Sequence, residues 1–316
     1  MQLIVGKITS IFLIVGIGFI ANKANVLPIS ANKYIVNLLM KITLPCMILA
    51  SITSNELKDG MISSTIQTFI GTMAYFAIAT VIGYFLCKKV FREKNTERIG
   101  IYTFSFAAIN NGFIGFPITM AIFGSEILYL MVINNIGLTL YLYSFGAMVL
   151  GLGTEEGKFS TKGFVNSLRN INTIAAFIGI LMLLAGIHLP SFVFDCIDMV
   201  GSSTTPLSML LVGMQLGQCE FDEVIKNRKL VGLSLLKVII LPVVTFFMVN
   251  WLPFTPEVKT CIIFAASLPV AVAVVPVVSD QNRDSLIAAE AVAISTLFSM
   301  ISIPVVSTFL TEFYGV

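Results

Sequence analysis

The chain consists of long apolar runs separated by short polar connections. None of the runs has the alternating pattern of a barrel strand, and an α-helix satisfies all of its own backbone hydrogen bonds in lipid. A helix needs roughly 20 residues to cross about 30 Å of hydrocarbon. The pattern therefore predicts an all-α polytopic membrane protein with ten transmembrane helices. The runs fall at about 2–22, 34–53, 61–87, 99–123, 127–150, 173–189, 196–218, 229–251, 258–279 and 284–310.

Composition agrees with a membrane protein. Of the 316 residues 57% are apolar and 11% are charged, and the mean hydropathy is +0.94. Soluble domains are about 25% charged, so this chain has too few charged side chains to cover a water-exposed surface. The net charge is only +2, and no basic run is interleaved with aromatic residues. The composition therefore predicts the lipid bilayer as a partner and no nucleic acid.

The distribution of Lys and Arg predicts how the helices are oriented. If the first helix runs inward, 14 basic residues fall in loops on one side and only Lys58 and Lys259 fall on the other. Basic loops stay in the cytoplasm, so both termini are predicted to be extracellular in a plasma-membrane protein. The first apolar run has a basic residue, Lys23, after it rather than before it. We therefore interpret this run as a retained span and not as a signal peptide.

A polar connection at 151–172 divides the chain into two halves. It predicts a first five-helix repeat at 1–150, a cytoplasmic linker at 151–172 and a second five-helix repeat at 173–316. Because five is odd, the second repeat would be inverted relative to the first. Prolines support this division, since Phe116-Pro117 in the fourth run corresponds to Leu268-Pro269 in the ninth.

The fourth run contains two amides, two glycines and a proline at 110–117. Such a segment favours a broken helix, and a break at membrane depth is tolerated only inside the protein or beside a cavity. The ninth run has a similar helix-breaking segment, with Pro269 and Pro276 around Ala271. Two crossing breaks would direct positive helix N-termini toward an anion, with Asn110 and Asn111 as donors. The alternative is a pair of kinked packing helices in which these amides provide only cohesion.

Ionisable and amide groups inside the spans are further candidates. Glu290 is the only acid well inside a span, and it suits either a proton or sodium site or a structural pair with a lysine. Asn135 and Gln215 are interior amides that suit either ligand binding or contacts between helices. For Lys41 and Lys237 we expect snorkelling to the cytoplasmic interface. The excess of positive charge inside the spans weakly favours an anionic substrate.

Metal, disulfide and enzyme chemistry have little support in the sequence. The five cysteines include no CxxC pair, and the single histidine, His188, has no Cys or Asp at ligand spacing. No Ser or Cys stands beside a base, and no paired acids lie inside a span. We expect no metal, no disulfide, no cofactor and no enzymatic activity.

Several motifs resemble the auxin efflux carrier family, which includes bacterial malate and malonate permeases and the plant PIN auxin exporters. They are Asn110 to Pro117, Pro206 with Leu211 to Gly217, Lys237 with Leu241-Pro242, Leu268-Pro269, Ser295-Thr296 and Ile303-Pro304. The resemblance implies ten helices, extracellular termini, and a scaffold and transport domain built from an inverted repeat. It also implies that the fourth and ninth helices cross at prolines, with substrate carboxylates bound beside the crossing.

Carried over residue by residue, the resemblance implies a site at Asn110, Pro117 and Pro269, with Asn111 and Gly115 beside them. The chain departs from the family where relatives often have a polar side chain after the ninth-helix proline, because it has Ala271, Ala273 and Val274 there. Glu290 is a second departure, and we hypothesise that it tunes substrate choice or proton coupling.

These inferences predict a secondary transporter of a small organic anion, such as a dicarboxylate or an auxin-like carboxylate, with elevator-type alternating access. The predicted substrate-binding residues are Asn110, Asn111, Gly115, Pro117, Pro269 and Ala271, and those for coupling or selectivity are Glu290, Asn135 and Gln215. A homodimer is left open. The alternative is a membrane sensor that binds ligand in the same pocket without moving it. It is disfavoured because no loop is long enough for an output domain.

Overall fold

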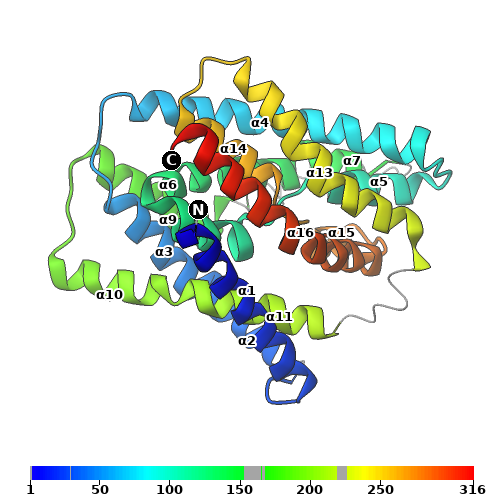
Figure 1. Ribbon diagram of the computed structural model, residues 1–316, viewed down its shortest axis with the longest axis horizontal. Coiled ribbons are helices and arrows are strands. Elements are labelled where there is room, and N and C mark those ends of the chain that lie inside the picture. Colours follow the sequence, from blue (N-terminus) through cyan, green and yellow to red (C-terminus); the bar gives the residue numbers. More distant parts are fainter. Residues whose placement is uncertain (1, 29, 153–164, 166–167, 219–225) are drawn as a thin grey trace.

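The computed structural model of the protein is a bundle of helices (Figure 1). It describes residues 2–28, 30–152, 165, 168–218 and 226–316, and every regular element in these ranges is helical. The prediction of an all-α polytopic membrane protein is confirmed at this level, because six helical stretches of the described ranges are long and apolar enough to cross a membrane. These stretches are Gly6–Lys23, Ala31–Thr53, Met61–Val90, Thr96–Leu150, Arg228–Asn250 and Ser285–Tyr314.

The first half of the chain contains three π-helical turns, η1 (Leu39–Thr43), η2 (Leu86–Val90) and η3 (Asn111–Gly115). Two of them, η1 and η3, end two residues before a proline, Pro45 and Pro117 respectively. A proline cannot donate the backbone hydrogen bond of a regular turn, so the chain widens locally before it. The α-helices of this half are α1 (Gln2–Lys23), α2 (Ala31–Leu38), α3 (Leu44–Thr53), α4 (Met61–Phe85), α5 (Thr96–Ala107), α6 (Phe116–Tyr143) and α7 (Phe145–Leu150).

The second half is more fragmented than the apolar runs predict. Its helices are α9 (Ile171–Leu184), α10 (Ser191–Ser202), α11 (Thr204–Gln218), α13 (Arg228–Asn250), α14 (Pro256–Ala266), α15 (Val274–Asp280) and α16 (Ser285–Tyr314). The predicted run at 196–218 is interrupted at Ser203, and the run at 258–279 is interrupted at 267–273. In the first half, Gly124 (φ 80°, ψ −171°) breaks α6 between the fourth and fifth predicted runs. Fewer spans than runs are found for three reasons: the runs at 196–218 and 258–279 are interrupted, α9 has only 14 residues, and the fourth and fifth runs form the single stretch Thr96–Leu150. The predicted linker at 151–172 lies mostly outside the described residues.

The helices pack into two groups. One group consists of α1, α3, α9, α10 and α11, in which α1 packs along α11 and α3 packs against α9 and α10. The other consists of α4, α5, α6, α13, α14, α15 and α16, in which α13 contacts both α14 and α16 and α15 packs on α16. Figure 1 shows α1, α10 and α11 along one side of the molecule and α4 and α13 along the opposite side. We call these the first and the second bundle.

Glycines allow α1 and α11 to approach each other closely. A Cβ atom added at Gly18 would overlap the carbonyl oxygen of Leu210, and one added at Gly213 would overlap that of Val15. Lipid tails provide little hydrophobic driving force between helices, so close backbone packing over small residues is a principal source of their association. Gly18 on α1 and Gly213 on α11 therefore stabilise the first bundle, because each lets the backbone of the other helix come close.

Substituting Gly18 by alanine should destabilise the protein, because its clash is with backbone that cannot rotate away. We expect a loss of about 1–3 kcal/mol, the usual cost of overpacking, measured by thermal unfolding in detergent. Gly16→Ala is the matched control on the same helix, because nothing lies within 4 Å of a Cβ atom there. It should leave the melting temperature unchanged or raise it slightly. Equal melting temperatures for the two variants would contradict the close crossing.

Candidate functional site

The helix formed by α5 and α6 is interrupted where the sequence combines amides, glycines and a proline. α5 ends at Ala107, and the next residue, Ala108, is extended (φ −68°, ψ 135°). Asn110 has a non-helical backbone (φ −88°, ψ 72°), and its side-chain Oδ1 accepts a hydrogen bond from the amide of Phe113 at 3.3 Å. The chain then passes through η3 into α6. We call residues 108–110 the first break.

A second interruption lies between α14 and α15, at residues 267–273, which we call the second break. The backbone amide of Asn110 donates a hydrogen bond of 2.9 Å to the carbonyl oxygen of Pro269, so the two breaks are in direct contact. Gly115 faces this contact, because a Cβ atom added there would lie 2.8 Å from Cδ1 of Leu268. Two segments about 160 residues apart in the sequence therefore meet through their non-helical backbones.

The backbone carbonyls released by the first break are satisfied by side chains from other helices. The ammonium of Lys237, on α13, donates to the carbonyl oxygens of Phe106 at 2.7 Å and Ala108 at 2.9 Å. The hydroxyl of Tyr75, on α4, donates to the carbonyl of Ala107 at 3.2 Å. In the second break the amide of Val270 donates to Oγ of Ser295 at 2.9 Å. Such partners are required where water cannot solvate free backbone groups.

Lys237 does not snorkel, and the prediction for this residue was wrong. Its side chain is completely buried, with 0% exposure. Carbonyls at the C-terminal end of a helix carry partial negative charge, so they attract an ammonium group and satisfy its donors. The sequence pattern placed Lys237 close enough to the cytoplasmic membrane interface to snorkel, but it did not show that the C-terminal end of α5 lies next to Lys237. Lys41, by contrast, is exposed, as a snorkelling residue would be.

A chain of buried amides supports the first break from α6 and α4. Nδ2 of Asn111 donates to Oδ1 of Asn134 at 2.9 Å, and Nδ2 of Asn134 donates to Oγ1 of Thr72 at 2.8 Å. Oδ1 of Asn111 is buried and has no hydrogen-bond partner among the described residues. Asn111 therefore contributes cohesion through one end of its amide and leaves a polar atom available at the other.

A cavity of about 110 Å³ lies beside the two breaks and between the two bundles. Four of the predicted residues line it, namely Asn110, Asn111, Asn135 and Ala271. Pro117, Pro269 and Gly115 are buried but do not line it; they shape the breaks that form its wall. Among the described residues, the lining contains amides, hydroxyls and apolar groups but no charged side chain. A small polar molecule could therefore be oriented here by hydrogen bonds.

Glu290 and Gln215 lie elsewhere. Gln215 lines a separate cavity of about 290 Å³ between α11 and α16, which reaches the second break at Val272. Glu290 is half-buried on α16 and lines neither cavity, although it interacts with other groups in the protein. The geometry does not bring these two residues together with Asn110.

Several cavity residues were missed because they stand where the sequence predicted a linker or an ordinary span. Asn170, Asn172 and Thr173 lie at the start of α9, where Oδ1 of Asn170 accepts from the amide of Asn172 at 2.9 Å and caps the helix. Oδ1 of Asn172 is also buried and has no partner among the described residues. Thr139 and Tyr143 line the cavity from α6. The signal in the sequence was the polar cluster Asn170-Ile171-Asn172-Thr173 next to an apolar run.

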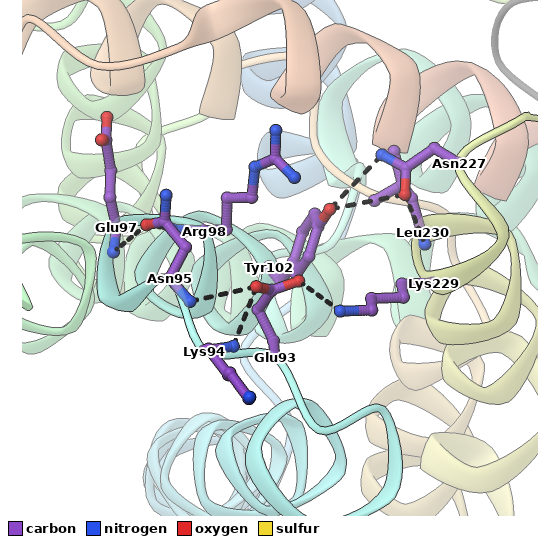
Figure 2. A network of polar contacts seen from close by, with 9 residues as sticks. All are labelled: Glu93, Lys94, Asn95, Glu97, Arg98, Tyr102, Asn227, Lys229 and Leu230. Carbon is purple, nitrogen blue, oxygen red and sulfur yellow. Dashed lines mark hydrogen bonds and ion pairs between the residues drawn. The ribbon is translucent and has the colours of Figure 1, made fainter.

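The start of α5 is also attached to α13, as Figure 2 shows. Glu93 forms an ion pair of 2.8 Å with Lys229, and the hydroxyl of Tyr102 lies 3.3 Å from Nδ2 of Asn227. Asn95 caps α5 by accepting from the amides of Glu97 and Arg98. Together with Lys237, these contacts connect both ends of α5 to α13, so the helix that leads into the first break is held at its two ends.

The carboxylate of Glu93 is stabilised by this network. Partial burial raises the pKa of Glu93, but the hydrogen bond from Lys229 and those from the backbone amides of Asn95 and Lys94 outweigh it. The pKa of Glu93 is consequently lowered from its ordinary value. The ionised form is the one that the folded protein prefers.

The described part of the chain contains no candidate metal site and no disulfide bond. No group of three or more His, Cys, Asp or Glu side chains there could hold a metal ion, and Cys46, Cys87, Cys196 and Cys261 are free thiols. Cys219 lies outside the described residues. The chemistry of the cavity is therefore that of neutral hydrogen-bonding groups.

Comparison with known proteins connects this geometry to transport. The profile of a family described as membrane transport protein matches residues 3–163 and 157–307. An uncharacterized transporter of Methanocaldococcus jannaschii is 22% identical over 301 residues, which cover 93% of this chain and 94% of that protein. An uncharacterized transporter of Methanothermobacter thermautotrophicus is 24% identical over 305 residues, which cover 96% and 97% of the two chains.

Water should reach η3, next to the first break, through the cavity. In a cysteine-free background, Gly112→Cys should react with a water-soluble thiol reagent, because Gly112 is half-buried, lines the cavity and has room for a Cβ atom. Ile118→Cys is the control, since this residue is 1% exposed and does not line the cavity. We expect at least about a tenfold difference in rate, because reaction requires an accessible thiolate. Equal protection at both positions would contradict an aqueous cavity.

Acid should remove the contribution of Glu93 to stability. A carboxyl whose pKa is lowered by folding stabilises the folded state above its unfolded pKa of about 4.3, and this stabilisation is lost as the pH falls through the folded value. Glu93→Gln should therefore reduce the free energy of unfolding at pH 7 by up to about 1 kcal/mol, the value of a partly exposed ion pair, and the melting temperature should fall with it. The difference should shrink below about pH 4.3. The exposed Glu97→Gln is the control, and a difference that persists in acid would exclude the ion pair as its cause.

Proposed function

The chain belongs to the membrane transport protein family, that of the auxin efflux carriers, and from this premise we propose that it is a secondary transporter of a small organic anion. The observation that carries the proposal is the hydrogen bond between the amide of Asn110 and the carbonyl of Pro269 beside a cavity. Helix interruptions are costly in a membrane, and their contact next to a polar cavity is typical of transporter substrate sites.

A carboxylate is the substrate group that suits this cavity. Its wall contains Asn110 and Asn111 at the start of η3, where backbone amides and the positive end of the following helix favour a negative group. Neutral amides orient a carboxylate without the desolvation cost of a buried countercharge in direct contact. The apolar part of the lining, which includes Phe113 and Leu138, suits a short hydrocarbon or aromatic body. A dicarboxylate or an auxin-like carboxylate fits this description.

The proposed architecture is a pair of inverted five-helix repeats with ten spans. α1 to α7 would form the first repeat, and α9 to α16 the second. Support comes from corresponding interruptions, since α5 and α6 are separated by the first break and α14 and α15 by the second. The geometry at Gly124 further divides α6 into two segments. The distribution of Lys and Arg supports a plasma-membrane orientation with both termini outside.

Alternating access would occur by an elevator-type movement of the second bundle, which contains both breaks, against the first. The cavity lies between the two bundles, with Met40 and Leu44 on one side and Asn110 on the other. Near Gly124, at the proposed extracellular end, exposed contacts connect other parts of the chain to α6: the ammonium of Lys7 donates to the carbonyl of Ala121 at 2.8 Å, and Lys58 pairs with Glu126 at 3.4 Å.

Uptake by proteoliposomes tests the proposal. Purified protein would be offered radiolabelled malate, malonate, succinate and indole-3-acetate, with an imposed membrane potential or pH gradient. We expect saturable uptake of one anion and at least about a tenfold loss in Asn110→Ala, the effect of losing a hydrogen bond to a charged group.

Asn250→Ala is the matched control, because Asn250 lies at the end of α13, outside the cavity, and should retain uptake. Absence of uptake for every anion under every gradient would contradict the transporter proposal. If an anion still bound to the protein in that case, the sensor interpretation would replace it.

A further inference from the structure

Lys237 is the completely buried cation next to the candidate site, and the cavity lining does not include it. Its ammonium contacts the carbonyl of Ala108, and the next residue, Ile109, is the first residue of the break that lines the cavity. The nitrogen lies 2.9 Å from that carbonyl oxygen, and successive Cα atoms are about 3.8 Å apart, so it lies about 7 Å from Cα of Ile109 and on the order of 10 Å from a ligand in the cavity. The positive charge is therefore behind the wall rather than in it.

No carboxylate within the described ranges forms an ion pair with Lys237. The ion pairs found there, Lys58 with Glu126 and Lys229 with Glu93, do not involve it. Its two contacts are neutral carbonyls, which satisfy donors but carry only partial charge. A buried charge that is solvated by dipoles alone retains a long-range field, because little water is present to screen it.

We propose that Lys237 is a selectivity-determining residue: the two carbonyl oxygens that it contacts would hold its side chain in the ammonium form, and this charge would make the cavity attract anions and repel cations. This inference rests on the proposed function only in taking the cavity as the substrate site. It separates two tasks: Asn110 and Asn111 would orient a ligand through short contacts, whereas Lys237 would set the preferred sign of its charge from a distance. A unit charge at about 10 Å in a medium of effective dielectric constant about 20 changes the local concentration of a monovalent ion on the order of tenfold.

Charged thiol reagents can measure this field without a substrate. Thr139, which is half-buried and lines the cavity from α6, would be replaced by cysteine in a cysteine-free background. The detergent-solubilised protein would react with an anionic and a cationic methanethiosulfonate of similar size. The ratio of the two rates reports the potential in the cavity, because both reagents attack the same thiolate and any change in its pKa cancels.

Lys237→Gln and Lys237→Met would be compared with Lys237→Arg in this assay. The two neutral variants differ in their donors, so they separate charge from hydrogen bonding. Removing the charge should lower the local concentration of the anionic reagent about tenfold and raise that of the cationic reagent about tenfold, so we expect the anionic-to-cationic rate ratio to fall about a hundredfold in both neutral variants and to be retained in Lys237→Arg. A protein that retains only the exposed native Cys196 on α10 is the control, and its ratio should not change.

A purely structural role predicts a different result. If Lys237 only holds the first break, the neutral variants would change both rates in parallel and leave their ratio unaltered, which would overturn the inference. An equal change in the Cys196 control would overturn it too, because the effect would then be global. Thermal unfolding and size exclusion would show which variants are folded, and the inference can be judged from either neutral variant.

The outcomes also separate this inference from the proposed function. A ratio that depends on Lys237, in a protein that transports none of the anions tested, would support the fixed charge and contradict the transporter assignment. Anion uptake with a ratio that does not respond to Lys237 would support the transporter assignment and overturn the inference.

Discussion

The structure depends on one constraint, which is that every backbone group released by a helix break inside the membrane needs a partner within the protein. Each carbonyl of 106–108 at the end of α5 has such a partner, and two of the three are satisfied by Lys237. An unsatisfied polar group in hydrocarbon would cost several kcal/mol. The break is therefore stable only because α13 and α4 place a lysine and a tyrosine opposite it.

This constraint also explains why the two breaks lie together. The amide of Asn110 has no helical partner, and the carbonyl of Pro269 accepts its hydrogen bond. Each break thus supplies what the other lacks, and the small size of Gly115 lets Leu268 approach. The contact cannot be separated from the cavity, because the segments that make it also form the cavity wall. Under the proposed function the amides of this region would serve both cohesion and ligand binding, and Asn111 serves cohesion through its bond to Asn134.

Attachment at both ends makes α5 a rigid part of the second bundle. Glu93 and Tyr102 hold its start to α13, and Phe106 holds its end through Lys237. Gly18 and Gly213 bring α1 and α11 into similarly close packing in the first bundle. The proposed elevator-type movement requires two tightly packed bundles that could move relative to each other with little internal change, and a polar cavity between them. This is the physical requirement for a site that is carried across a membrane by one of the bundles.

The amino-acid sequence by itself determined the membrane class, the helical secondary structure and the family. The membrane class and the helices follow from the length and composition of the apolar runs, because these decide whether a segment is stable in a bilayer. The family follows from short motifs such as Asn110 to Pro117. The sequence also located the first break, because a proline and two glycines weaken a helix wherever they stand. The burial of Lys237, the contribution of Asn172 from the start of α9 and the separation of Gln215 from Asn110 were decided only by the tertiary structure. The reason is that each depends on which helix ends beside which, and contacts between residues more than 60 positions apart leave no periodic signal in a single chain.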